Sequence, residues 1–312
     1  MFKRLVIQLQ APRMRTFSIA TRTKPFQVAI DGPAASGKST TAKMVAQRLG
    51  FDYIDSGAFY RCITLAALSK GINPSDPATV GQISEIAEQC KIGLQTVFAK
   101  PSETVSSGEE GVFQKLTCLP TTRVFLNSKD VSSEIRSNNV SQHVSAVAAI
   151  RNVREAVLQK IRSIRARENN NNNNNNNNKQ DSDNTPNLSS SQSQSIVVSE
   201  GLVMDGRDIG TVILPHADLK IFLVADSRIR AERRLQELVK NGLDPTLNKL
   251  DVDTVQRDLQ RRDELDRTRK VSPLRKADDA MVLDTSNLTI EGQVDVIVQE
   301  VERRRGDNVK VV

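Results

Sequence analysis

Short apolar runs alternate along the chain with longer stretches of helical periodicity. The apolar runs are too short for helices and are predicted as buried strands; they cover residues 26–30, 202–204, 219–224 and 281–284. Between and after them, helices are predicted over 38–49, 57–69, 227–240 and 251–269, and over a last segment that buries Val294, Ile297, Val298 and Val301. Strands that alternate with helices indicate an α/β protein with a parallel sheet.

The middle of the chain departs from this alternation. Residues 92–98 and 123–127 form a locally β-rich stretch, and 144–166 give the clearest helical pattern, with apolar residues every three or four positions. Ten asparagines, Asn169 to Asn178, and a Ser/Gln/Asp/Asn stretch then follow. Such a segment cannot bury apolar surface, so we expect a disordered loop over about 167–195. An inert insertion is favoured over an interaction role.

Charge is concentrated at the N-terminus. The 312 residues carry a net charge of +7, and six basic residues precede the first carboxylate, Asp31. Basic, acid-free N-termini are typical of transit peptides, so 1–25 is predicted to direct import into the mitochondrial matrix. A basic tail on a cytoplasmic protein is the alternative. Because the remainder is nearly neutral, we expect no nucleic-acid partner. No apolar run approaches ~18 residues, so we expect no membrane span.

A phosphate-binding loop follows the first predicted strand. The segment from Gly32 to Ser39 matches G-x-x-x-x-G-K-[ST] and leads into a predicted helix, which is the context that this motif requires. Backbone N–H groups of such a loop surround a phosphate, Lys38 reaches the β/γ-phosphates, and the Ser39 hydroxyl is a ligand for Mg²⁺. The expected ATP-binding residues are Gly32, Pro33, Ala34, Ala35, Ser36, Gly37, Lys38, Ser39 and Thr40.

The chain also carries a pattern that occurs in GTPases. Asn248-Lys249-Leu250-Asp251 matches the guanine-reading N-K-x-D pattern, but it follows a turn and not a buried strand. Asp251 is more simply predicted as the N-cap of the next helix. The GTPase interpretation is therefore disfavoured.

The helix over 251–269 carries a face that changes from apolar to charged. Residues on this face recur at spacings of three and four; they are Val252, Val255, Leu259, Arg262, Asp266 and Arg269. Internal ion pairs at a solvated helix end contribute only ~0.2–0.5 kcal/mol each, so they do not explain why the stripe keeps its register. With Arg61 and Arg207, the stripe suggests phosphoryl transfer between two phosphorylated ligands.

The ordered chain from about 26 to 304 resembles the bacterial-type cytidylate kinases. The resemblance rests on six segments in order. They are Ala29–Thr40, Asp55–Arg61 (DSGAFYR), Asp130–Arg136 (DVSSEIR), Val153–Ala156 (VREA), Asp205–Thr211 (DGRDIGT), and Arg262–Arg269 (RDELDRTR) followed by Ser272-Pro-Leu.

This resemblance implies a phosphate-loop nucleoside monophosphate kinase fold and the transfer of the ATP γ-phosphate to CMP or dCMP, in pyrimidine nucleotide metabolism. It implies one kinase domain over 26–312, with a β-containing monophosphate-binding insert at about 71–140 and a short lid at about 240–250. A monomer is expected. Leu265 departs from the pattern, because many bacterial members carry an arginine there.

The resemblance also assigns roles to residues. Ser56, Ser145, Arg154 and Asp208 would read the cytosine. Arg61, Arg207 and Arg269 would hold the acceptor phosphate, while Arg262 and Asp266 would serve the phosphate and the ribose. Arg233 or Arg234 would approach ATP from the lid, and Arg234 is our choice. The residues expected to act in the transfer itself are Lys38, Arg207, Arg234, Arg262 and Arg269.

A second class of function stays open on the sequence. A non-catalytic nucleotide-binding protein could use its asparagine-rich loop for interactions. The intact Lys38, Ser39 and arginine set favours the enzyme.

Overall fold

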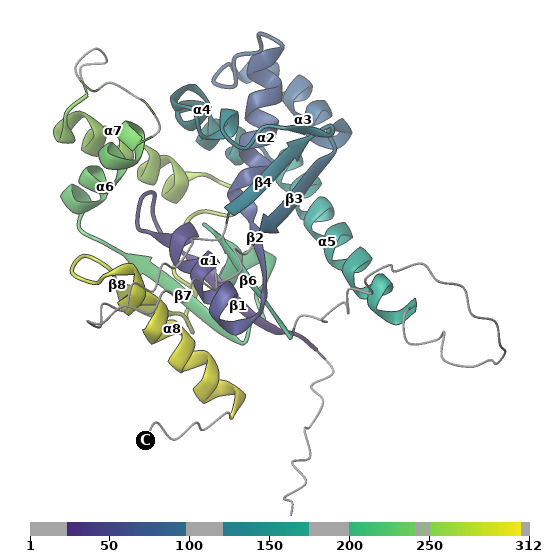
Figure 1. The fold of residues 1–312 in the computed structure, drawn as a ribbon. Coiled ribbons are helices and arrows are strands. Elements are labelled where there is room, and N and C mark those ends of the chain that lie inside the picture. The colour runs from purple at the N-terminus through teal and green to yellow at the C-terminus, as the bar shows by residue number, and fades with distance from the viewer. Residues whose placement is uncertain are drawn as a thin grey trace, which may run out of the picture.

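The computed structural model of the chain describes residues 24–97, 121–174, 200–240, 242, 245 and 250–306, with side chains up to 163 in the second range. A parallel sheet lies at the centre, a helical region with a small second sheet lies on one side, and a pair of helices lies on the other (Figure 1). Within these residues, no helix is both long and apolar enough to cross a membrane.

The central sheet has the strand order β2-β6-β1-β7-β8, and every neighbouring pair is parallel. Its strands are β1 (Phe26–Asp31), β2 (Asp52–Asp55), β6 (Gly201–Gly206), β7 (Leu219–Val224) and β8 (Met281–Asp284). In β1, side chains alternate between two apolar cores, with Val28 and Ile30 on one face and Ala29 on the other. The sheet is therefore covered on both sides, as parallel sheets usually are.

Helices on each face complete these cores. The α1 (Lys38–Leu49) and α8 (Ile290–Arg305) helices pack on the face of Val28 and Ile30. On the Ala29 face lie α2 (Ser56–Ser69), α3 (Val80–Gln89), α4 (Asn138–Ala149) and α5 (Arg151–Asn174). The final helix buries Val294, Ile297, Val298 and Val301, as its periodicity predicts.

The β-rich stretch forms its own small antiparallel sheet. Its strands are β3 (Ile92–Val97), β4 (Thr121–Leu126) and β5 (Lys129–Asp130), in the order β3-β4-β5. Two 3₁₀ turns, η1 (Pro77–Thr79) and η2 (Glu134–Arg136), flank the segment. Val124 and Ile135 bury their side chains against Ala58 and Cys62 of α2, which fixes this sheet to the helices beside the central sheet.

The prediction of a single helix over 144–166 was wrong. Two helices, α4 and α5, meet at Ile150, whose backbone is extended (φ −75°, ψ 121°). The apolar period continues across the break because both helices pack into the same core. Arg154 donates to the carbonyl of Ala148 (3.0 Å), so its guanidinium supplies a partner at the end of α4.

The remaining elements include α7, the helix that carries the charged stripe. A π-helical turn, η3 (Ile209–Ile213), follows β6, and α6 (Ser227–Lys240) packs against α7 (Val252–Thr268). Asp251 caps α7 by accepting from the backbone N–H of Thr254 (2.7 Å), which confirms its predicted role.

Three predicted segments lie wholly or mostly outside the described residues. They are the basic segment 1–25, the loop 167–195 beyond Asn174, and the lid 240–250 except for Lys240, Gly242, Pro245 and Leu250. The α5 backbone continues to Asn174, past the position at which the loop is predicted to begin.

Candidate functional site

The phosphate loop connects β1 to α1 and has the backbone that its glycines predict. Gly32 has φ +149°, and a Cβ there would lie 2.3 Å from the carbonyl oxygen of Leu223, so only glycine fits. Gly37 has φ +88° at the N-cap of α1. Ala35 also lies in the left-handed region (φ 58°), a conformation that a non-glycine residue keeps only when its surroundings hold it.

Lys38 is buried and folded over the loop. Its Nζ donates to the carbonyl of Pro33 and to Ser36 Oγ (3.3 Å). Burial, followed by the nearby Arg207, lowers the pKa of Lys38 well below its ordinary value, although Asp205 and Asp263 act in the opposite direction. Because the nearby carboxylates offset the cost of burying this charge only in part, Lys38 favours an anionic partner.

The hydroxyl of Ser39 meets a carboxylate that sequence reasoning missed. Ser39 donates to Asp205 Oδ2 (2.7 Å), and Tyr53 donates to Asp205 Oδ1 (2.7 Å). Burial, and then the charge of Asp55, raises the pKa of Asp205 to about 6. The available signal was its place at the end of an apolar strand, β6, which lies beside β1 in the sheet. Among the described residues, no cluster of three or more His, Cys, Asp or Glu side chains forms a ready metal site.

Four arginines from separate elements gather beside the loop. Arg61 of α2 donates to the carbonyl of Ile135 (2.9 Å) and to Ser141 Oγ (2.9 Å), and Arg234 of α6 donates to the same hydroxyl (3.3 Å). Burial and then the charge of Arg262 lower the pKa of Arg61 to about 9, with further contributions from Arg234 and Arg207.

Arg262 of α7 is, like Arg61, buried beside other arginines. Burial and then Arg207 lower its pKa to about 10, and its buried Nε has no hydrogen-bond partner in the described part of the chain. A buried guanidinium nitrogen without a partner is costly, so a ligand that accepts hydrogen bonds is expected there. Arg61, Arg207, Arg234 and Arg262 together form an arginine cluster.

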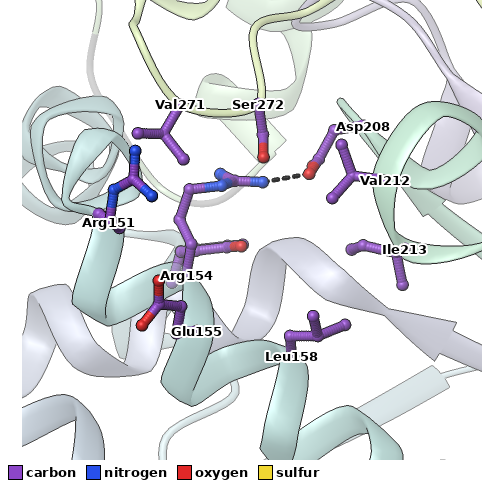
Figure 2. Close-up of a pocket in the computed structure, with 10 residues that line it drawn as sticks. Arg151, Arg154, Glu155, Leu158, Asp208, Val212, Ile213, Val271 and Ser272 are labelled. Atoms are coloured by element: carbon purple, nitrogen blue, oxygen red, sulfur yellow. Dashed lines mark hydrogen bonds and ion pairs between the residues drawn. The ribbon is translucent and has the colours of Figure 1, made fainter.

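A cavity of about 170 Å³ opens next to this cluster. Figure 2 shows Arg154 paired directly with Asp208 in the lining of this cavity, where Val212, Ile213 and Leu158 form apolar walls. The Arg154–Asp208 ion pair is almost completely buried. Arg154 also lies over the ring of Tyr60 (5.3 Å to the centroid). The cavity thus combines apolar walls with one buried acceptor and one buried donor.

Asp208 and Asp266 connect the cavity to the cluster through Arg269. Arg269 lies 3.9 Å from Asp208 and 3.4 Å from Asp266, which in turn pairs with Arg207 (3.0 Å). Arg154 Nε and Arg269 Nη2 are buried without hydrogen-bond partners among the described residues. Arg154, which lines the cavity, and Arg269, which connects the cavity to the cluster, therefore each have a hydrogen-bond donor available for a ligand.

The other predicted residues lie around this site. Ser56 donates to the backbone carbonyl of Asp205 (2.7 Å), and Ser145 is buried in α4. Arg234 belongs to the arginine cluster. Arg233 instead donates to the carbonyl of Thr285 (2.6 Å), whose hydroxyl donates to the carbonyl of Ser36 (3.2 Å). Arg233 and Arg234 are the two arginines predicted to approach ATP. Of these, Arg233 is therefore the one connected to the phosphate loop, through Thr285.

Curated bacterial proteins resemble the chain over most of its length. A protein named cytidylate kinase from Limosilactobacillus reuteri is 37% identical over 284 residues, 91% of this chain and 98% of the relative. The cytidylate kinase of Limosilactobacillus fermentum is 40% identical over 90% of this chain and 97% of its own. That of Bacillus subtilis is 36% identical over 90% of this chain and 98% of its own.

These relatives correct one prediction. The mitochondrial localisation inferred from residues 1–25 is wrong, because the matching relatives are bacterial enzymes and bacteria have no mitochondrial matrix. A basic, acid-free segment is a compositional feature, and composition alone does not distinguish an import signal from any other basic N-terminus.

The family assignment agrees with the geometry. The family model described as cytidylate kinase matches residues 28–172 and 186–303, and so includes the phosphate loop, the arginine cluster and the cavity. The parallel sheet flanked by helices is the fold that the sequence predicts for such a kinase. The chain belongs to the cytidylate kinase family.

Proposed function

We propose that the protein transfers the γ-phosphate of ATP to CMP or dCMP and releases ADP with CDP or dCDP. The observation that carries this proposal is the arginine cluster: the charge of Arg207 acts on Lys38 of the phosphate loop, and Asp266 and Arg269 connect Arg207 to the buried Arg154–Asp208 pair of the cavity. Donor phosphates, acceptor phosphate and base would then follow one another in space. This order is what a nucleoside monophosphate kinase requires.

The loop would hold the donor. The N–H groups of residues 32–40 and the N-terminus of α1 favour a phosphate. Lys38 would exchange its contacts with Pro33 and Ser36 for phosphate oxygens.

Mg²⁺ fits the residues beside the loop. Mg²⁺ binds through one or two protein oxygens together with substrate phosphates, and it prefers hydroxyl and carboxylate oxygens. Ser39 and Asp205 present such oxygens 2.7 Å apart. They would hold the ion, and Tyr53 would orient the carboxylate. When bound with ATP, Mg²⁺ would neutralise charge that develops on the phosphates.

The acceptor would lie with its phosphate among the arginines and its base in the cavity. The exocyclic amine of cytosine is a donor, so the Asp208 carboxylate suits it and repels the O4 acceptor of uracil. Ser56, Ser145 and Arg154 would complete the recognition of the base. Arg269 and Asp266, which lie between the two regions, would contact phosphate and ribose.

The transfer would depend on position and charge. A phosphate oxygen of the acceptor is itself the nucleophile, so little general-base assistance is needed. The bond from that oxygen to the γ-phosphorus forms as the bond to the β-phosphate oxygen breaks. Charge spreads over the equatorial oxygens in the transition state, where the arginines would stabilise it. One arginine in such a place contributes ~10³–10⁵ in rate.

We further propose a single kinase domain over 26–312, with a monophosphate-binding insert at about 71–140 and a lid at about 240–250. It would act as a monomer on small molecules, without nucleic acid or membrane partners. The three strands of the small sheet, β3, β4 and β5, lie within the insert.

A coupled assay for ADP formation with CMP, dCMP and UMP tests the proposal. We expect turnover with CMP or dCMP and much less with UMP. The Lys38→Ala variant should lose at least 10²-fold in kcat, because Lys38 no longer reaches the β/γ-phosphates. Its Tm should stay close to that of the native chain, because the substitution removes a cation whose burial is unfavourable. ATP binding without turnover of any of the three would instead support the non-catalytic alternative.

A further inference from the structure

A buried ion pair outside the proposed substrate contacts holds the phosphate loop. Arg230 of α6 and Asp263 of α7 have side chains 8% and 4% exposed, and they form a salt bridge. Neither residue belongs to the arginine cluster or lines the cavity described above. Apart from the influence of Asp263 on the pKa of Lys38, their charges therefore need an explanation other than substrate binding.

Both members of this pair also bind the backbone of Ala34. Asp263 Oδ1 accepts from the N–H of Ala34 (3.0 Å), while Arg230 Nη1 donates to the carbonyl of the same residue (3.1 Å). Arg230 Nε donates in addition to the carbonyl of Ala225, just after β7 (3.2 Å). The N–H and C=O of one loop residue are thus tied to two helices and to a strand end.

The neighbourhood of Ala34 explains why the loop needs such a hold. Ala35, the next residue, has a left-handed backbone (φ 58°), which other contacts must maintain. The methyl group of Ala34 packs against Ala231, Val255 and Leu259 of α6 and α7. Polar and apolar contacts therefore join the same residue of the loop to the same two helices.

The position of Asp263 on α7 gives the contact a second consequence. Arg262 and Asp266, one residue before it and three after it, belong to the proposed acceptor site. Successive helix residues point about 100° apart, so one turn of α7 presents Asp263 to the loop and Arg262 to the acceptor. Figure 1 shows α6 and α7 as a pair beside the sheet.

Stability alone gives little reason for an ion pair here. Well-packed apolar residues often replace a buried ion pair without loss of stability. A pair that binds both the N–H and the C=O of one loop residue does what apolar residues cannot, since only polar groups can hydrogen-bond to the backbone and so fix its orientation.

We infer that Arg230 and Asp263 are positioning residues that set the phosphate loop in register with the acceptor arginines of α7. This inference rests on the proposed function and deepens it. In-line transfer needs the donor and acceptor phosphates in contact, and a displacement of about 1 Å can cost ~10²-fold in rate. The pair acts through Ala34 and α7, without contact to either substrate.

The sharpest test is Asp263→Glu, which keeps the charge pair but adds one methylene between α7 and the loop. We expect kcat to fall at least tenfold, while the Kd values for ATP alone and for CMP alone, from calorimetry, change less than threefold. Arg230→Lys, which keeps the charge but loses the guanidinium fork, should behave in the same way and carries the test if Asp263→Glu does not fold. An unchanged kcat, or weaker ATP binding with an unchanged kcat at saturation, would overturn the inference.

Asp279→Glu is the control. Asp279, whose side chain is exposed, pairs with the buried Lys220 of β7 (2.9 Å) and not with the backbone of the phosphate loop. The added methylene there should change kcat less than twofold. An equal loss of kcat in this control would show that lengthening any such pair slows the enzyme, and the register argument would fail.

Amide hydrogen exchange supplies a readout that does not depend on turnover. In the nucleotide-free native chain, the Ala34 amide should exchange at least 10²-fold more slowly than in an unstructured peptide, and Asp263→Glu should speed it at least tenfold. An unprotected Ala34 amide would overturn the inference. A native chain that turns over no CMP or dCMP would instead remove the proposed function, and the exchange result would still decide whether the pair holds the loop.

Discussion

At the scale of single residues, Asp208 decides the base in the proposed reaction. It is a buried carboxylate paired with Arg154 and lies 3.9 Å from Arg269. Asp208→Asn places an amide that can donate where the carboxylate only accepts, so uracil gains a partner and cytosine loses a charge-assisted one. We expect the ratio of kcat/KM for CMP to that for UMP to fall about 10- to 100-fold, or about 1.4–2.8 kcal/mol.

A second carboxylate on the same cavity serves as the control. Glu155 lines the cavity, but Figure 2 shows the contact to Asp208 made by Arg154 and not by Glu155. Glu155→Gln should leave the CMP/UMP ratio within twofold of the native value. If Asp208→Asn left the ratio unchanged as well, base reading by Asp208 would be refuted, whatever the variant did to the absolute rate.

The site residues that the sequence predicts are those that lie within recognisable motifs. Lys38 and Ser39 stand at fixed positions of one local pattern. Asp205 and Asp263 were missed as functional groups because their partners are distant in sequence: Asp205 lies 166 residues from Ser39, and Asp263 lies 229 residues from Ala34. Periodicity placed Arg262 and Asp266 on one face of α7, but gave no reason to consider the adjacent Asp263.

At the scale of elements, Asp31 joins the end of β1 to the turn that carries Asp208. Its carboxylate accepts from the N–H groups of Ile209 (2.8 Å) and Gly210 (2.7 Å) in η3. Burial is the largest influence and raises the pKa of Asp31 from 3.8 to about 6, although these two hydrogen bonds lower it. The folded chain therefore holds this proton more tightly than the unfolded chain does.

This raised pKa predicts a pH dependence with a definite sign. The contribution of Asp31 to stability is fully present below the unfolded pKa of 3.8 and is lost as pH rises through about 6. The free energy of unfolding of the native chain, minus that of Asp31→Asn, should thus increase by about 2 kcal/mol between pH 7.5 and pH 4.5. Urea titrations at several pH values measure it. The constant offset from altered hydrogen bonds cancels in the slope, and a flat or opposite slope would contradict the prediction.

Elements were predicted well where a single buried face defined them. The strands β1, β7 and β8 and the helices α1, α6 and α7 end within a residue of their predicted bounds. The break at Ile150 was not predicted, because hydrophobic periodicity indicates which residues are buried and not whether the helical backbone is continuous. The partner for the α4 end is the side chain of Arg154, beyond the break, and local pattern does not reveal such a contact.

At the scale of the whole molecule, the site exists only where several parts of the fold meet. The arginine cluster takes Arg61 from α2, Arg207 from the end of β6, Arg234 from α6 and Arg262 from α7. Alternating strands and helices predicted a parallel sheet, but the order β2-β6-β1-β7-β8 is a tertiary property that the pattern does not contain. The net charge of the chain was equally uninformative about these four residues, because the charge excess lies largely in the N-terminal segment.

This convergence predicts that a small dianion stabilises the whole fold. Asp266 pairs with Arg207, but Arg61 and Arg262 reach no salt-bridge partner among the described residues. Burial, and then repulsion from the other arginines of the cluster, lowers the pKa of both. An anion that binds only the folded chain adds about 2.7 kcal/mol when present at ~100 times its Kd. Low-millimolar sulfate or phosphate should therefore raise Tm more than chloride does at equal ionic strength.

Sulfate also stabilises many folded proteins because it is excluded from their surface. Arg61→Gln separates this general effect from binding at the cluster, since it removes one ligand for the anion but leaves the general effect unchanged. The difference in Tm between sulfate and chloride should shrink by at least half in Arg61→Gln, and an equal difference in both chains would show that the cluster binds no anion.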